Sequence, residues 1–161
     1  MTPSRIVLLA VLLAPQLVAA RRPIFADSSA VCPVTEPNGN APPGAQSSDS
    51  YYGNGTLWTT PWPDGVVVFR PGGPGSIELD GSLHMKFPWV RGVRGKLTIQ
   101  GKRLDAPAPP LRAHIPDGYG DTGFQATGII FPSEGCWEVT GKVGDSSLTF
   151  VTRVVRVEEH K

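Results

Sequence analysis

Short apolar segments separated by glycine and proline constrain the fold of this chain more than any other feature. The sequence has 19 glycines and 17 prolines among 161 residues, and both residues interrupt long helices and favour turns. Short strands at regular spacing, with turn sequences such as Asp80-Gly81 between them, are typical of a β-sandwich or a β-barrel. The expected strands are 56–60, 65–70, 77–79, 82–88, 95–103, 111–115, 122–131, 136–143 and 147–157.

The C-terminal segment shows most clearly the period of two that marks a half-buried strand. In residues 136–143, Trp137 and Val139 fall on one face and alternate with polar residues on the other. A turn at 144–146 leads into a further apolar segment, so residues 136–157 should form a hairpin. We therefore expect an all-β protein with the fold of an immunoglobulin-like antiparallel β-sandwich.

The N-terminus has the three-part layout of a secretory signal peptide. Arg5 is followed by an apolar run at 6–13, and Val18-Ala19-Ala20 supplies the small residues of a cleavage site. Cleavage near Ala26 is an alternative. The apolar run is too short to span a bilayer, and no second one follows, so no transmembrane segment is expected in the mature chain. A lipoprotein would need a cysteine directly after this run, whereas Cys32 lies about a dozen residues further on.

The composition divides the chain into three parts. Residues 1–20 are the expected signal peptide, residues 21–50 a Pro/Gly/Ser-rich arm, and residues 51–158 the sandwich domain. The arm is too poor in apolar residues to order itself, so it is either a disordered leader or a strap that begins at Cys32. Export places the protein outside the cytoplasm: secreted, periplasmic or at the cell surface.

The two cysteines, Cys32 and Cys136, are expected to form one disulfide in this oxidising compartment. Cys136 falls on the polar face of its strand, with Glu138 and Thr140. The bond should therefore clip the arm over the outside of a sheet rather than bridge two sheets through the core. A reactive thiol is the alternative, but neither cysteine has a strongly basic neighbourhood.

Charge and motifs exclude several classes of function. The net charge is +1 and no basic block occurs, which argues against nucleic-acid binding. Residues 118–123 match G-x-G-x-x-G but follow a proline-rich loop and enter a strand, so no dinucleotide cofactor is expected. Residues 71–76 resemble the oxyanion loop of some serine peptidases, yet the required nucleophile elbow is missing. The histidines at 84, 114 and 160 lack the spacing of a metal site.

Two groups of residues are candidate contacts for a ligand. Asp117 and Asp121 lie on one glycine-rich loop and are candidate calcium ligands, although turn chemistry alone explains the same residues. Among the aromatic residues, Tyr52, Trp58 and Trp62 lie in turn-rich surroundings and are candidates for stacking against a ligand. The alternative for each tryptophan is a place in the core.

The sequence Phe-Pro-Ser-Glu-Gly-Cys-Trp-Glu-Val-Thr-Gly at 131–141, followed by 147–151, resembles the C-terminus of a family of exported bacterial proteins of unknown function. Blocks at 52–54, 57–58, 86–89 and 95–97 are similar to recurring blocks of that family. The resemblance implies an immunoglobulin-like sandwich outside the cytoplasm, and it implies no catalytic residues.

These features predict a non-catalytic, exported module that binds or supports something at the cell surface, either an envelope protein or a glycan. The alternative is a small secreted hydrolase or carbohydrate-active module that uses carboxylates such as Asp117, Asp121 or Glu138. A hydrolase would need two of these carboxyl groups about 5–10 Å apart in a cleft.

Overall fold

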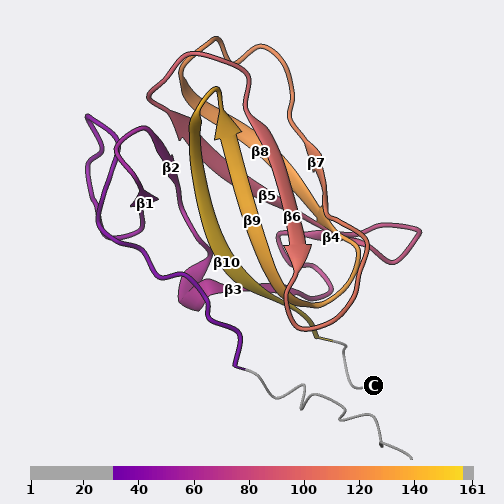
Figure 1. Cartoon of the computed structure of the whole chain (residues 1–161). Coiled ribbons are helices and arrows are strands. Elements are labelled where there is room, and N and C mark those ends of the chain that lie inside the picture. Colours follow the sequence, from indigo (N-terminus) through magenta and orange to yellow (C-terminus); the bar gives the residue numbers. More distant parts are fainter. Residues whose placement is uncertain (1–30, 158–161) are drawn as a thin grey trace, which may run out of the picture.

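The computed structural model describes residues 31–157, and the predicted signal peptide at 1–20 lies outside them. These residues form strands and one short 3₁₀ helix (Figure 1), and none of their helices is long and apolar enough to cross a membrane. The elements are β1 (Tyr52–Gly53), β2 (Leu57–Thr59), η1 (Pro63–Gly65), β3 (Val66–Phe69), β4 (Ser76–Ile77), β5 (Leu83–Arg91), β6 (Thr98–Arg103), β7 (Arg112–His114), β8 (Gly123–Phe131), β9 (Gly135–Val143) and β10 (Ser146–Arg156).

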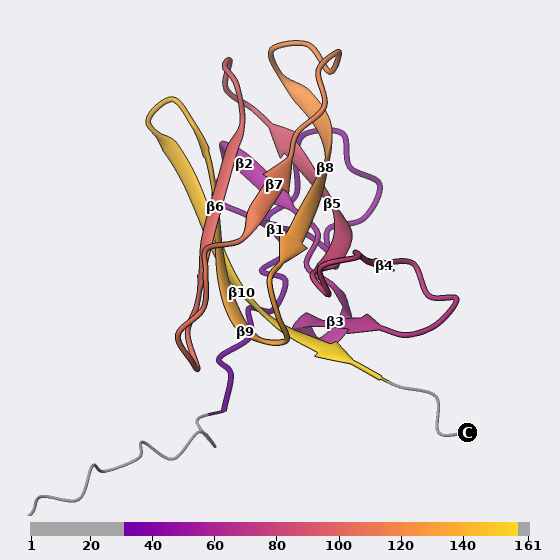
Figure 2. The ribbon, with the colours of Figure 1, turned by 90° about the vertical axis from the view of Figure 1, so that its right-hand side faces the viewer.

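Two sheets pack face to face, which confirms the predicted all-β sandwich (Figures 1 and 2). One sheet has the order β1-β2-β5-β8-β7, with β4 paired to β5, and the other has the order β3-β10-β9-β6. Every pairing is antiparallel except that of β3 with β10, which is parallel. This departs from the expected antiparallel arrangement because the chain leaves β2, turns through η1 and enters the opposite sheet as β3.

Aromatic side chains fill the space between the sheets. Phe87 stacks on Phe150 with ring centroids 5.7 Å apart, and Phe131 meets Trp137 at the same distance. Trp89 is fully buried and lies against Gly141 of the facing sheet. Burial of each such ring contributes roughly 2–3 kcal/mol, so these side chains dominate the stability of the sandwich.

The predicted disulfide joins Cys32 to Cys136 across 104 residues. Cys136 lies in β9 beside the inward-facing Trp137 and is not part of the core cluster. Cys136 alternates with the inward-facing Trp137, as expected, and the residue is only 3% exposed because the arm that it binds covers it. The arm accounts for this burial: Thr35 exchanges two hydrogen bonds with Val151 of β10, at 2.8 and 2.9 Å, and so lies directly against the sheet.

Beyond Thr35, two asparagines attach the arm to the first strands. Asn38 exchanges hydrogen bonds with the backbone of Gly53, donating to its carbonyl at 2.8 Å and accepting from its N–H at 3.1 Å. Asn40 accepts a hydrogen bond from Trp58 Nε1 at 2.9 Å. Residues 31–51 therefore form a strap along the sandwich although they contain no strand or helix of their own.

Candidate ligand-binding site

A hollow of about 330 Å³ opens at one end of the sandwich. Its walls come from the β5–β6 connection at residues 92–97 and the β7–β8 connection at residues 115–122, which lie at the upper end of Figures 1 and 2. Arg91 and Gln125 complete the lining. We call this cavity the loop hollow. Its volume falls within the range of about 300–1,000 Å³ typical of small-molecule sites.

The guanidinium of Arg91 joins the two walls of the loop hollow. Arg91 is the last residue of β5 and is only 3% exposed. Its Nη1 donates to the carbonyl of Gly95 at 2.9 Å, and its Nη2 donates to the carbonyls of Tyr119 at 3.1 Å and Gly120 at 2.9 Å. Carbonyl dipoles thus compensate a buried positive charge that would otherwise be costly.

One donor of this buried side chain has no acceptor among the described residues. The Nε–H of Arg91 is buried without a hydrogen-bond partner within residues 31–157. An unpaired buried donor costs about 1–3 kcal/mol, so it calls for an explanation. Trp89 Nε1 is a second buried donor without a partner in the same range, so this feature is not confined to the loop hollow.

An exposed aromatic pair stands beside the loop hollow. Tyr119, which lines the hollow, and Phe124 of β8 have ring centroids 5.9 Å apart at an interplanar angle of 57°. Phe124 is 55% exposed and Tyr119 is 37% exposed. Grouped aromatic surface of this kind is typical of a binding site, whereas single exposed apolar residues are common everywhere.

The structure brings Asp117 and Asp121 to the same hollow, where Lys96 also lies. Both aspartates are exposed, and Asp121 pairs with Arg94 at 3.9 Å. The carbonyls of Tyr119 and Gly120 on this loop accept hydrogen bonds from Arg91, and calcium binding by Asp117 and Asp121 stays a prediction. Within residues 31–157, no group of three His, Cys, Asp or Glu side chains is arranged to hold a metal ion.

The predicted aromatic contacts need a correction at Trp58. This residue is only 4% exposed, since Asn40 of the arm binds its indole N–H and its ring packs on Gly53 and Gly92. Tyr52 is half-buried and packs against the core, so it offers only part of its ring. The sequence did not show that the arm would cover these strands.

Trp62 remains at the surface, half-buried between two shallow hollows of about 380 and 220 Å³. Pro63 borders both of them, and Pro61 and Pro88 border the smaller one. This surface fits the predicted contact by aromatic and proline-rich loops. It lacks the fixed polar groups of the loop hollow, so we rank it second.

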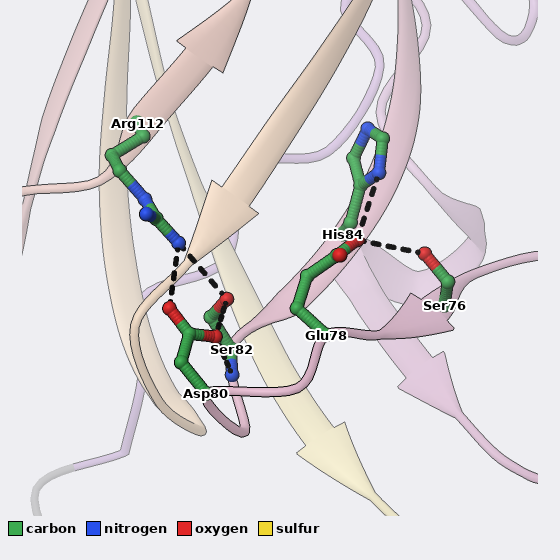
Figure 3. Close-up of polar contacts among 6 residues, drawn as sticks. All are labelled: Ser76, Glu78, Asp80, Ser82, His84 and Arg112. Atoms are coloured by element: carbon green, nitrogen blue, oxygen red, sulfur yellow. Dashed lines mark hydrogen bonds and ion pairs between the residues drawn. The ribbon is translucent and has the colours of Figure 1, made fainter.

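A polar cluster holds the β4–β5 hairpin in place (Figure 3). Asp80 accepts hydrogen bonds from the backbone N–H of Ser82 at 2.9 Å and from its hydroxyl at 2.5 Å, while Arg112 of β7 donates to Asp80 at 3.0 Å. The hydroxyl and N–H of Ser82, followed by Arg112, hold the pKa of Asp80 below its usual value. The carboxylate therefore stays ionised and serves as an acceptor that ties the turn to β7.

The second half of this cluster contains a serine, a glutamate and a histidine, but not in the order of a catalytic triad. Ser76 Oγ donates to Glu78 Oε1 at 3.1 Å, and His84 Nδ1 lies 3.4 Å from the same oxygen (Figure 3). A hydrolytic serine must instead donate to the histidine that accepts its proton. Because both groups converge on the carboxylate, the arrangement is suited to bracing the hairpin.

The remaining candidate carboxylate, Glu138, lies on the outer side of β9. It pairs with Lys102 of the neighbouring β6 at 3.4 Å. Nearby, hydrogen bonds from Arg103, and then one from the backbone of Cys136, lower the pKa of Asp105. Arg103 thus holds Asp105 at one end of β6, and the ion pair of Glu138 with Lys102 links β9 to β6.

The sequence did not point to Arg91 and Tyr119, which line the loop hollow, or to Phe124 beside it. A signal existed for Arg91, because it continues the inward-facing series of β5 after Phe87 and Trp89. An arginine at a core position of a strand calls for buried acceptors. For Tyr119 the sequence offers no such signal, because turn chemistry alone explains the glycines and aspartates around it.

Comparisons of the chain with models of protein families, with curated proteins and with solved structures found no match. The function is therefore argued from the geometry of the site.

Proposed function

We propose that this protein is an exported, non-catalytic β-sandwich module that binds its ligand at the cell surface through the loop hollow. The observation that carries this proposal is the exposed pair Tyr119–Phe124 at the edge of a cavity whose two loops are fixed by the buried Arg91. Loops that are held in place before binding lose little conformational entropy on binding, which favours affinity.

Export and the immunoglobulin-like topology are parts of the same proposal. The Cys32–Cys136 disulfide suits an oxidising compartment. When β1, β3 and β4 are left out, the other seven strands can be lettered A to G along the chain. The orders β2-β5-β8-β7 and β6-β9-β10 then correspond to the A-B-E-D and C-F-G sheets of immunoglobulin domains. Membership of the exported bacterial family that the 131–141 block resembles also belongs to this proposal.

The alternative function, a small secreted hydrolase, receives less support. Its general acid would need a carboxyl group whose surroundings favour protonation, most often through burial. Asp117 and Asp121 line the hollow but are exposed, and Asp121 already pairs with Arg94 at 3.9 Å. Their positions suit hydrogen bonding to a ligand better than proton donation to a leaving group.

Co-sedimentation with washed, insoluble cell envelopes of the source organism tests the proposal. We expect the exported protein to bind and the variant Phe124→Ala to bind roughly three- to tenfold more weakly, the size of one lost aromatic contact. Leu104→Ala is the matched control, because Leu104 is 42% exposed and lies outside the lining of the loop hollow.

Three results would contradict the binding function. The first is failure of the unmodified protein to sediment with envelopes, and the second is equal binding by Phe124→Ala. The third is release of soluble fragments from the envelopes that stops in Asp117→Asn, which would favour the hydrolase.

A further inference from the structure

We infer that the ligand of the loop hollow is a neutral saccharide, a step that rests on the binding function proposed above. Three features of the hollow lead to this class of ligand: the balance of its charges, its mixture of donors and acceptors, and the aromatic pair beside it.

The charged residues that line the hollow cancel one another. Arg91 and Lys96 supply two positive charges, and Asp117 and Asp121 supply two negative ones. An anionic ligand would meet the two carboxylates, and a cationic ligand would meet the guanidinium and the ammonium group. A neutral ligand avoids both penalties.

The exposed charged side chains of the lining offer donors and acceptors together. The carboxylates of Asp117 and Asp121 only accept hydrogen bonds, whereas the ammonium group of Lys96 only donates them. A hydroxyl group does both, so neighbouring hydroxyls of one molecule can pair with acceptors and donors on different walls. A polyhydroxylated ligand therefore satisfies this lining better than a ligand with one kind of polar group.

The aromatic pair supplies the apolar half of the site. One face of a sugar ring carries mostly C–H groups, and these pack well on an aromatic ring. Phe124 and Tyr119 present such rings at the surface, tilted by 57° to each other. The Tyr119 carbonyl is held by Arg91 at 3.1 Å, which limits the movement of this part of the platform.

The size of the site also favours a small ligand over a protein surface. The hollow encloses about 330 Å³ between two short loops, and small-molecule sites typically enclose about 300–1,000 Å³. A sugar residue within a longer glycan would enter such a cavity, with its neighbours resting on the exposed rings.

Selective destruction of the envelope components tests this inference. Envelopes are treated either with periodate, which cleaves the vicinal diols of sugars, or with a broad protease, and are then used in co-sedimentation. We expect periodate to abolish binding and protease to leave it unchanged. Loss of binding after protease treatment alone would overturn the saccharide and leave the binding function standing. Absence of binding to untreated envelopes would instead overturn the binding function itself.

Salt and one conservative variant test neutrality. Between 50 and 500 mM NaCl we expect less than a twofold change in Kd, since a neutral ligand forms no ion pairs for salt to screen. Asp117→Asn should weaken binding about two- to fivefold through a lost acceptor, and the exposed Asp49→Asn in the arm serves as control. A tenfold loss with salt, or tighter binding by Asp117→Asn, would show an acidic ligand and overturn the inference.

Discussion

Gly141 leaves space between the two sheets for the indole ring of Trp89. A Cβ atom at this position would lie 2.5 Å from that ring, which is fully buried and cannot move aside. The neighbouring residues of the 131–141 block have structural roles as well: Cys136 forms the disulfide, and Trp137 donates its indole N–H to the carbonyl of Ser133 at 3.0 Å. The most distinctive block of the sequence is thus explained by packing.

This explanation predicts a difference between two glycines. Gly141→Ala should lower the free energy of unfolding by about 1–3 kcal/mol, because it overpacks a closed core. Gly128→Ala should cost less, since its Cβ would meet the ring of His84, whose side chain is 32% exposed and can turn away. Urea denaturation of both variants measures the difference. Equal losses would show that Trp89 adjusts as freely as His84.

At the scale of single residues, the sequence predicted inward and outward positions well where a strand alternates. Trp137 faces the core as expected, and the disulfide joins the expected pair. Trp58 was misjudged because its burial depends on Asn40, which is 18 residues away in a segment without a repeating pattern. Contacts of this kind leave no periodic signal in the sequence.

At the scale of elements, the sequence pattern predicted only part of β5. The expected strand ended at Pro88, a residue that lacks the N–H of a ladder hydrogen bond. In the structure β5 continues to Arg91. The Pro88 carbonyl accepts a hydrogen bond from the Thr59 side chain at 2.8 Å, so the backbone of Pro88 faces β2. The pairing of β2 with β5 ends at Thr59 and Trp89, so Pro88 needs no N–H to bond to β2. A proline at this position is tolerated because the neighbouring strand stops there.

The disulfide and the strap it anchors lead to a prediction at the scale of elements. Cys32→Ala should lower the free energy of unfolding by about 2–4 kcal/mol, because the unfolded chain loses a cross-link. The bond closes a loop of 104 residues. The strands should keep their circular dichroism spectrum, since Cys136 is outside the core cluster. Equal melting temperatures of the oxidised and reduced protein would contradict this account.

For the molecule as a whole, the loop hollow joins two connections that are far apart in the sequence. Residues 92–97 link strands of different sheets, and residues 115–122 link the neighbouring strands β7 and β8. The sequence predicted most of the strands, so it predicted that both loops exist, but it did not show that they meet. Their meeting depends on the packing of the two sheets and on Arg91, whose partners are backbone carbonyls of any residue type.

Arg91 should therefore control the order of both loops together. In Arg91→Leu, the carbonyls of Gly95, Tyr119 and Gly120 lose their charged donor, and each such hydrogen bond contributes about 1.5–3 kcal/mol at most. Hydrogen exchange should accelerate at 92–97 and 115–122 while β9 and β10 stay protected, because those strands hold their own ladder.

Arg91→Lys separates charge from geometry. Lysine keeps the positive charge but lacks the planar fork that reaches three carbonyls, so we expect it to restore only part of the protection. Envelope binding should fall in the same order, from the native protein to the lysine variant to the leucine variant. Exchange that accelerates in only one loop, or equally across β9 and β10, would show that Arg91 does not couple the two walls. Binding that survives full loop opening would separate the ligand from this hollow altogether.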